Sequence, residues 1–125
     1  MKRMIPVLLA LLLLAGCGGG EETAPYRQIS QEEAKKMMDT QEVIILDVRE
    51  QDEYDSGHIP GAVLLPVGAI DEDTAAAVIP AKDATVLVYC RSGNRSKTAS
   101  SALAELGYTN VYEFGGIKTW PYETE

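Results

Sequence analysis

The chain has 125 residues, and its 11 Lys and Arg against 19 Asp and Glu give a formal net charge of −8 at pH 7. Such an acidic protein repels nucleic acid and anionic lipid headgroups, so we expect neither as a binding partner. A hydrophobic content of 46% with 24% charged residues is ordinary for a folded domain. At this length we expect one small core with one site near its edge.

The first 25 residues predict a targeting segment and a tether rather than a part of the fold. Lys2 and Arg3 precede an apolar run at 5–14 that is interrupted only by Pro6. This run is too short to span a bilayer, which needs roughly 20 residues as a helix, and it fits a secretory leader. We therefore predict a signal peptide at 1–16, an acylated cysteine with a flexible tether at 17–25, and a folded domain at 26–125.

The residues around Cys17 carry a more specific signal. Leu14–Cys17 (LAGC) resembles the lipobox of bacterial lipoproteins, in which the cysteine is acylated and becomes the mature N-terminus. This resemblance implies an extracytoplasmic protein, on the periplasmic or cell-surface side, that is held to a bacterial membrane through its lipid anchor only. The alternative for Cys17 is a disulfide bond with Cys90, which acylation would exclude.

Strand and helix patterns alternate through the folded part. Apolar runs at 43–46 and 85–89 predict buried strands, and 62–65, 110–113 and 26–29 predict shorter ones. A capping-box pattern at 30–33 predicts a helix that runs to about Asp39, and further helices are expected at 50–56, 68–78, 96–106 and from 117 onward. This order predicts an α/β fold: a mainly parallel sheet with helices on both faces and a site at the carboxyl ends of the strands.

The loop at 90–96 (CRSGNRS) joins the most apolar strand to a predicted helix. A glycine-containing loop of this kind turns successive backbone N–H groups toward one point, which makes an anion-binding nest at the helix N-terminus. In that nest, beside Arg91 and Arg95, we expect Cys90 to be a thiolate and the nucleophile. Gly93 permits a backbone conformation that is closed to other residues.

The other loop residues are small and polar. Ser92, Asn94 and Ser96 leave room for a substrate, and Ser96 is also a candidate N-cap of the following helix. The competing interpretation of Cys90 is a buried cysteine that ends a core strand. The neighbouring arginines argue against it, because burying their charge without an anion is costly.

At this point the sequence is similar to the rhodanese family, whose active-site loop has the form Cys-Arg-x-Gly-x-Arg or Thr. The stretches 46–50 (LDVRE), 53–54 (EY) and 57–62 (GHIPGA) also resemble the amino-terminal signature of that family in content and spacing. The resemblance covers about Tyr26 to Tyr122. It implies a five-stranded parallel sheet and a thiosulfate sulfurtransferase, in which Cys90 takes a sulfane sulfur from thiosulfate or a persulfide donor and holds it as a persulfide.

The resemblance also implies roles for other residues. Sulfur would pass from Cys90 to a thiophilic acceptor such as cyanide, a dithiol or a cysteine of another protein. Arg91 and Arg95 would bind the anionic donor, and the amides of the loop would hold the persulfide. Asp47 and Arg49 are predicted to form an ion pair that supports the loop region.

The remaining titratable residues do not indicate further chemistry. His58 is expected to be a hydrogen-bonded turn residue beside Pro60. Sulfur transfer through a preformed thiolate requires no general base. We expect no cofactor and no metal site, because one histidine and one cysteine of the folded part make no ligand cluster.

Three other functions stay open at this level. Cysteine phosphatases and arsenate reductases use a Cys-x5-Arg loop, whereas the spacing here is Cys-x4-Arg and Ser96 stands where the longer loop needs its arginine. A sulfur-carrier or binding module that hands sulfur only to a partner protein would have the same loop as an enzyme, and turnover with thiosulfate and cyanide would separate the two. A thiol–disulfide role is disfavoured because no second cysteine lies near Cys90.

Overall fold

The computed structural model describes residues 25–125, so the predicted signal peptide and Cys17 lie outside the described residues. Five strands form one sheet in the order β1-β5-β4-β2-β3, and every neighbouring pair is parallel. The strands are β1 (Arg27–Gln28), β2 (Ile44–Asp47), β3 (Val63–Leu64), β4 (Thr85–Cys90) and β5 (Asn110–Gly116). The predicted five-stranded parallel sheet is confirmed.

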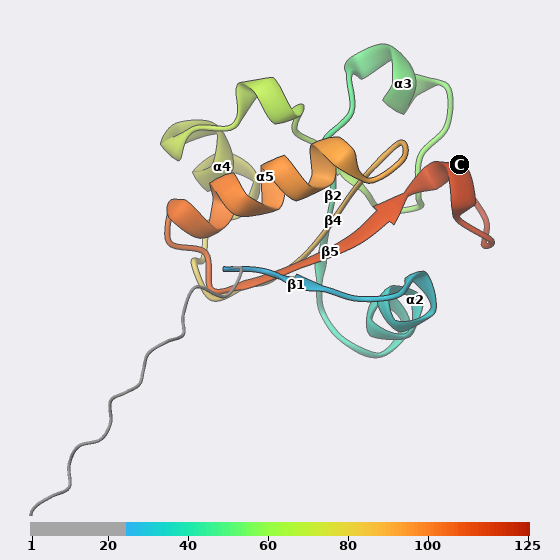
Figure 1. Ribbon diagram of the computed structural model, residues 1–125, viewed down its shortest axis with the longest axis horizontal. Coiled ribbons are helices and arrows are strands. Elements are labelled where there is room, and N and C mark those ends of the chain that lie inside the picture. Colours follow the sequence, from blue (N-terminus) through green and yellow to red (C-terminus); the bar gives the residue numbers. More distant parts are fainter. Residues whose placement is uncertain (1–24) are drawn as a thin grey trace, which may run out of the picture.

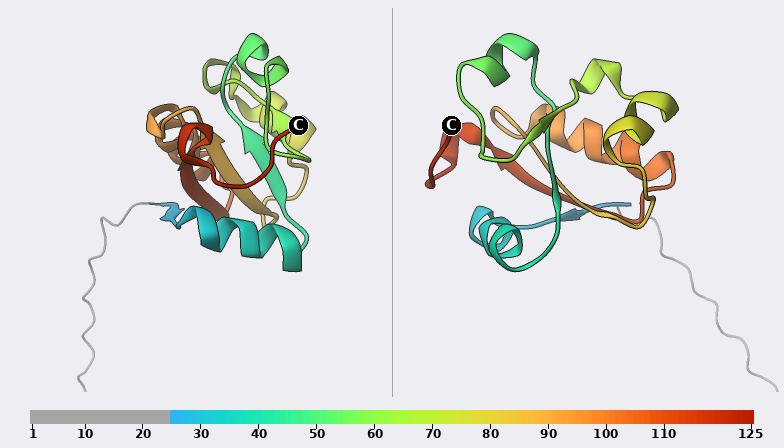
Figure 2. Two further views of the ribbon diagram at one scale, coloured as in Figure 1. Left: turned by 90° about the vertical axis from the view of Figure 1, so that its right-hand side faces the viewer. Right: turned by 180° about the vertical axis from the view of Figure 1, so that it is seen from behind.

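Helices cover both faces of this sheet, as predicted. They are α2 (Gln31–Thr40), α3 (Gln51–Asp55), α4 (Glu72–Val78) and α5 (Asn94–Glu105), with 3-10 turns η3 (Val67–Ala69) and η4 (Ile117–Thr119). In Figure 1, α4 and α5 lie on one side of the strands and α2 lies on the other. Figure 2 shows the same two layers from two other directions. Within residues 25–125, no helix has the length and apolar character needed to cross a membrane.

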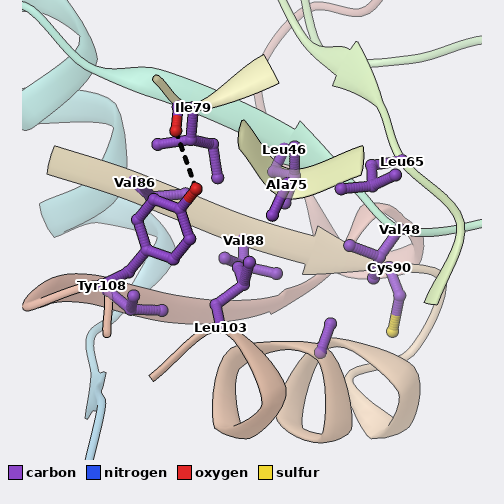
Figure 3. Close-up of a cluster of buried hydrophobic side chains, with 12 residues drawn as sticks. Leu46, Val48, Leu65, Ala75, Ile79, Val86, Val88, Cys90, Leu103 and Tyr108 are labelled. Carbon is purple, nitrogen blue, oxygen red and sulfur yellow. Dashed lines mark hydrogen bonds between the residues drawn. The ribbon is translucent and has the colours of Figure 1, made fainter. Parts of the chain in front are cut away.

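The central strand β4 is apolar and buried from Val86 to Cys90 because both of its faces are covered. Val86, Val88 and Cys90 belong to the core cluster under α4 and α5, whereas Leu87 and Tyr89 belong to the cluster on the side of α2. This alternation is the period of a strand, whose successive side chains point to opposite faces. In Figure 3, Val86, Val88 and Cys90 follow one another along β4, and the sulfur of Cys90 is directed toward the start of α5. The strand therefore places the thiol at the carboxyl edge of the sheet.

Two helix predictions were wrong in detail. The single helix expected at 68–78 is divided into η3 and α4. Asp71 starts α4 with a capping box, because its carboxylate accepts from the Thr74 N–H at 2.8 Å while the Thr74 hydroxyl accepts from the Asp71 N–H at 2.9 Å. The helix expected from residue 117 onward is only the turn η4. Pro121 follows this turn closely, and a proline does not continue a helix.

Candidate active site

Cys90 ends β4, and the loop 91–93 leads directly into α5. The residue is buried, with 1% of its surface exposed, and it forms no disulfide with any residue of the described part of the chain. Its Sγ accepts a hydrogen bond from the Gly93 N–H at 3.0 Å and lies 3.5 Å from the Ser96 Oγ. The sulfur is thus enclosed by the loop and the first turn of the helix.

The surroundings of the sulfur favour its charged form. Burial raises the pKa of Cys90, but hydrogen bonds from the Ser96 hydroxyl and from the backbone N–H groups of Ser96, Gly93 and Ser92 outweigh burial and lower the pKa below the ordinary value of a thiol. These N–H groups lie at the N-terminus of α5, where the helix dipole also stabilises negative charge. The site therefore favours the thiolate, which is the nucleophilic form.

Two glycines allow the loop to take this shape. Gly93 has φ +107°, a left-handed conformation that favours glycine, and it is the N-cap of α5. Gly116 of β5 passes so close to the loop that a Cβ on it would lie 2.0 Å from the Arg91 carbonyl oxygen and 2.5 Å from the Ser92 nitrogen. Sequence reasoning missed Gly116, although the pair Gly115-Gly116 next to the strand predicted at 110–113 was a visible signal of a close backbone approach.

Ser96 does not cap α5, so that prediction was wrong. Because Gly93 turns the chain in its left-handed conformation, the helix already begins at Asn94. Ser96 consequently lies in the first turn with none of its surface exposed. Its hydroxyl points inward, where it donates to the Glu113 carboxylate of β5 and lies 3.0 Å from the Gly93 carbonyl oxygen.

The two loop arginines are in different situations. Arg95 forms a two-pronged ion pair with Glu53 of α3, with Nη1–Oε1 and Nη2–Oε2 distances of 2.8 and 3.0 Å. The Arg95 guanidinium, together with the Glu50 N–H, lowers the pKa of Glu53 to about 2. Arg91 is exposed and its side chain has no hydrogen bond or ion pair within residues 25–125. Glu53 stands in the family-like stretch, but its role as the partner of Arg95 was missed.

The residues that were expected to support the loop region lie at the end of β2 and around α3. Asp47 and Arg49 form the predicted ion pair, with an Nη2–Oδ2 distance of 2.7 Å, and both are buried. The Tyr89 hydroxyl of β4 donates to the same Asp47 carboxylate at 2.7 Å, which joins the ends of β2 and β4. The His58 Nδ1 lies 3.0 Å from the Tyr54 carbonyl oxygen, and the His58 ring stacks on the Tyr54 ring at 3.9 Å between centroids.

Residues 90–96 therefore form one compact unit around the sulfur. Ser92 and Asn94 lie on its exposed side, whereas Gly93 and Ser96 are buried against β5. Within residues 25–125 no group of His, Cys, Asp or Glu side chains has an arrangement that could hold a metal ion. What this unit can do chemically is attack an electrophilic atom with a thiolate and stabilise negative charge on the product through backbone N–H groups.

A parallel α/β domain with a cysteine of lowered pKa in a loop of N–H donors is the arrangement expected of proteins that transfer groups through a cysteine. Residues 30–122 match the family model of the rhodanese-like domain. This chain therefore belongs to the rhodanese-like family.

Individual relatives agree with this assignment. The chain is 38% identical over 96 residues to thiosulfate sulfurtransferase GlpE of Coxiella burnetii, a match that covers 76% of this chain and 87% of the relative. It is 42% identical over 73 residues to thiosulfate sulfurtransferase PspE of Escherichia coli, covering 58% and 69%. Among solved structures, a rhodanese with anions from E. coli superposes with a TM-score of 0.63 at 33% identity, covering 67% of this chain and 98% of that one.

Proposed function

We propose that this rhodanese-type sulfurtransferase moves a sulfane sulfur from thiosulfate or a persulfide donor to a thiophilic acceptor, with Cys90 as the carrier. The observation that carries the proposal is the buried Cys90 sulfur, which accepts the Gly93 N–H at 3.0 Å and has a lowered pKa. The names of the relatives GlpE and PspE support thiosulfate as a donor.

The reaction has two displacement steps. The Cys90 thiolate attacks the outer sulfur of thiosulfate, the S–S bond of the donor breaks, and sulfite leaves with the bonding electron pair. The persulfide that remains on Cys90 is anionic and is stabilised by the loop N–H groups. A nucleophilic acceptor, either cyanide or a thiolate, then attacks the outer sulfur and releases the Cys90 thiolate.

The charges around the loop bear on the choice of donor. Arg95 is already neutralised by Glu53, so Arg91 is the loop arginine that is free to attract an anionic donor. A doubly charged anion such as thiosulfate therefore meets a weaker positive field than the two arginines of the sequence would provide. We infer that thiol persulfides are used at least as efficiently as thiosulfate, and that a protein thiol can serve as the acceptor.

The test is the intact mass of the purified full-length chain before and after incubation with thiosulfate, followed by cyanide and detection of thiocyanate. One added sulfur that cyanide removes with turnover supports a sulfurtransferase, and the Cys90→Ala variant should neither gain sulfur nor release thiocyanate. Full activity in Cys90→Ala would refute the mechanism. If sulfur is taken up but small acceptors do not remove it, the chain is a carrier for a partner protein.

A second proposal concerns location. We propose that the chain is an extracytoplasmic lipoprotein, on the strength of the apolar run at 5–14 and the lipobox-like Leu14–Cys17. Acylation of Cys17 would anchor the domain stably, because each buried methylene contributes about 0.8 kcal/mol to membrane binding. Cys17→Ala should leave sulfur transfer unchanged and release the protein from the membrane fraction; retained attachment would contradict the proposal.

A further inference from the structure

A buried carboxylate next to the active-site loop has no part in the mechanism so far. Glu113 lies in β5 and is 2% exposed. Its Oε1 accepts from the Gln28 side-chain amide at 3.1 Å, and its Oε2 accepts from the Gly115 N–H at 3.0 Å and from the Ser96 hydroxyl. Among residues 25–125 no arginine, lysine or histidine forms an ion pair with it. Burying a carboxylate with neutral partners alone is costly, which points to a role other than stability.

Ser96 connects this carboxylate to the nucleophile. Its Oγ lies 3.5 Å from the Cys90 Sγ and donates to Glu113 Oε2, and all three side chains are buried. A hydroxyl group has one hydrogen to donate and lone pairs with which to accept, so Ser96 can accept from the thiol while it donates to the carboxylate. The donation to Glu113 is favoured over that to the Gly93 carbonyl oxygen, because a charged acceptor makes the stronger hydrogen bond. An unbroken row of donors and acceptors thus runs from thiol to carboxylate.

We propose that Glu113 takes up the Cys90 proton through Ser96. In this step the thiol proton moves to the Ser96 Oγ while the Ser96 proton moves to Glu113 Oε2. The S–H bond and the original O–H bond break, a new O–H bond forms at each oxygen, and a thiol with a carboxylate becomes a thiolate with a carboxylic acid. No proton has to leave for solvent, and Glu113 acts as a positioning residue that reaches the sulfur only through Ser96.

This exchange keeps the number of buried charges constant. The site holds one negative charge before and after the step, on Glu113 first and on Cys90 afterwards. Two adjacent buried anions would repel each other, and the internal transfer avoids that state. In the thiolate state the Ser96 hydrogen is free to turn toward the sulfur, where it adds to the N–H donors of the loop. When an acceptor removes the outer sulfur, Cys90 is released as a thiolate and the same path returns the proton.

Two cations of α5 lie near the path between Cys90 and Glu113. From α5, the Arg95 guanidinium interacts with the Cys90 charge, and Lys97 lines the same surface groove as Glu113. From β1, the uncharged side-chain amide of Gln28 donates a hydrogen bond to the Glu113 carboxylate. Arg95 therefore acts on the thiolate, whereas Lys97 shares a groove with Glu113 but forms no ion pair with it.

The test measures thiolate formation directly and so does not depend on the proposed sulfur transfer. The rate of Cys90 alkylation by iodoacetamide is followed against pH in the full-length chain, with the modified peptide identified by mass so that Cys17 does not contribute. Internal proton transfer predicts that the wild-type rate levels off to a plateau as pH falls, over the range in which Cys90 and Glu113 share one proton, because the fraction of thiolate then no longer depends on proton release to solvent. The rate falls again only when the pair takes up a second proton. In Glu113→Gln, whose amide fits the same space but cannot accept the proton, the rate should keep falling tenfold for each pH unit.

Two further variants make the result decisive. Ser96→Ala keeps Glu113 but removes the bridge, so it should lose the plateau as Glu113→Gln does, and it provides the test if Glu113→Gln does not fold. Glu105→Gln removes an exposed carboxylate of α5 and should retain the plateau. A wild-type protein without a plateau, or a plateau that survives in both Glu113→Gln and Ser96→Ala, would overturn the proposal. A protein that shows the plateau but takes no sulfur from any donor would instead refute the proposed function alone.

Discussion

Replacement of Gly116 by alanine tests how the active-site loop is held. The new methyl group would lie 2.0 Å from the Arg91 carbonyl oxygen and 2.3 Å from its carbonyl carbon, whereas ordinary contact begins at 3.4 Å. Both obstructing atoms belong to the backbone, so no side chain can rotate away. The loop and β5 must therefore separate by about 1.4 Å, the difference between 3.4 and 2.0 Å.

That displacement affects activity more than folding. Overpacking of this kind typically costs about 1–3 kcal/mol of stability, which the domain can survive. The same movement shifts the Gly93 N–H, which now lies 3.0 Å from the Cys90 sulfur. Because a misplacement of about 1 Å in an active site can cost about 100-fold in rate, we expect Gly116→Ala to transfer sulfur about 100-fold more slowly while remaining folded.

The assay compares thiocyanate production from thiosulfate and cyanide with urea unfolding of the same protein. Gly68→Ala is the matched control, because a Cβ at Gly68 meets no atom within 4 Å and its φ is not in the left-handed range. The control should have wild-type activity and stability. A wild-type transfer rate in Gly116→Ala would refute the reasoning, since the loop would then not depend on its contact with β5.

Further predictions concern the ion pair and one orphan hydroxyl. Glu53→Gln removes the charge that neutralises Arg95, so we expect a lower KM for thiosulfate with little change in kcat. An unchanged KM would contradict the inference that Glu53 weakens the attraction of the loop for an anionic donor. Because the pKa of Glu53 falls from 4.5 to about 2 on folding, the contribution of the ion pair, roughly 1 kcal/mol for this partly exposed pair, is complete above pH 4.5. It is lost as pH falls toward 2, so the Tm values of wild type and Glu53→Gln should converge there. Ser100 has a buried Oγ with no partner in the described part of the chain, so Ser100→Ala should leave stability unchanged or raise it by about 1 kcal/mol; a loss measured by urea unfolding would show that the hydroxyl is used.

The sequence predicted those parts of the fold and the site that depend on local pattern. The run at 85–89 is apolar because β4 is covered on both faces, and this character is visible without any knowledge of the neighbouring strands. The loop 90–96 follows the strand directly, so its glycine, its arginines and the helix after it could be recognised together. The capping box of α4 was equally local, but it was overlooked and two elements were merged into one.

The rest of the site depends on contacts between distant segments. Glu53 and Arg95 are 42 residues apart in sequence, and Ser96 and Glu113 are 17 apart. Glu113 meets Ser96 only because β5 pairs with β4 beneath the first turn of α5. In sequence it is one glutamate in a predicted strand, and because glutamates are rarely buried it gives no sign of its place beside a nucleophile.

These long-range contacts change the account of how the nucleophile is stabilised. From the sequence alone, two arginines beside Cys90 suffice to explain a thiolate. In the folded protein one of them is committed to Glu53, while the donors that contact the sulfur are backbone N–H groups. Fixed dipoles in a buried site need no counter-ion and are screened by salt far less than exposed charges. The loop therefore stabilises the thiolate by its shape, so we expect the glycines at 93 and 116 to be needed for this chemistry together with the arginines.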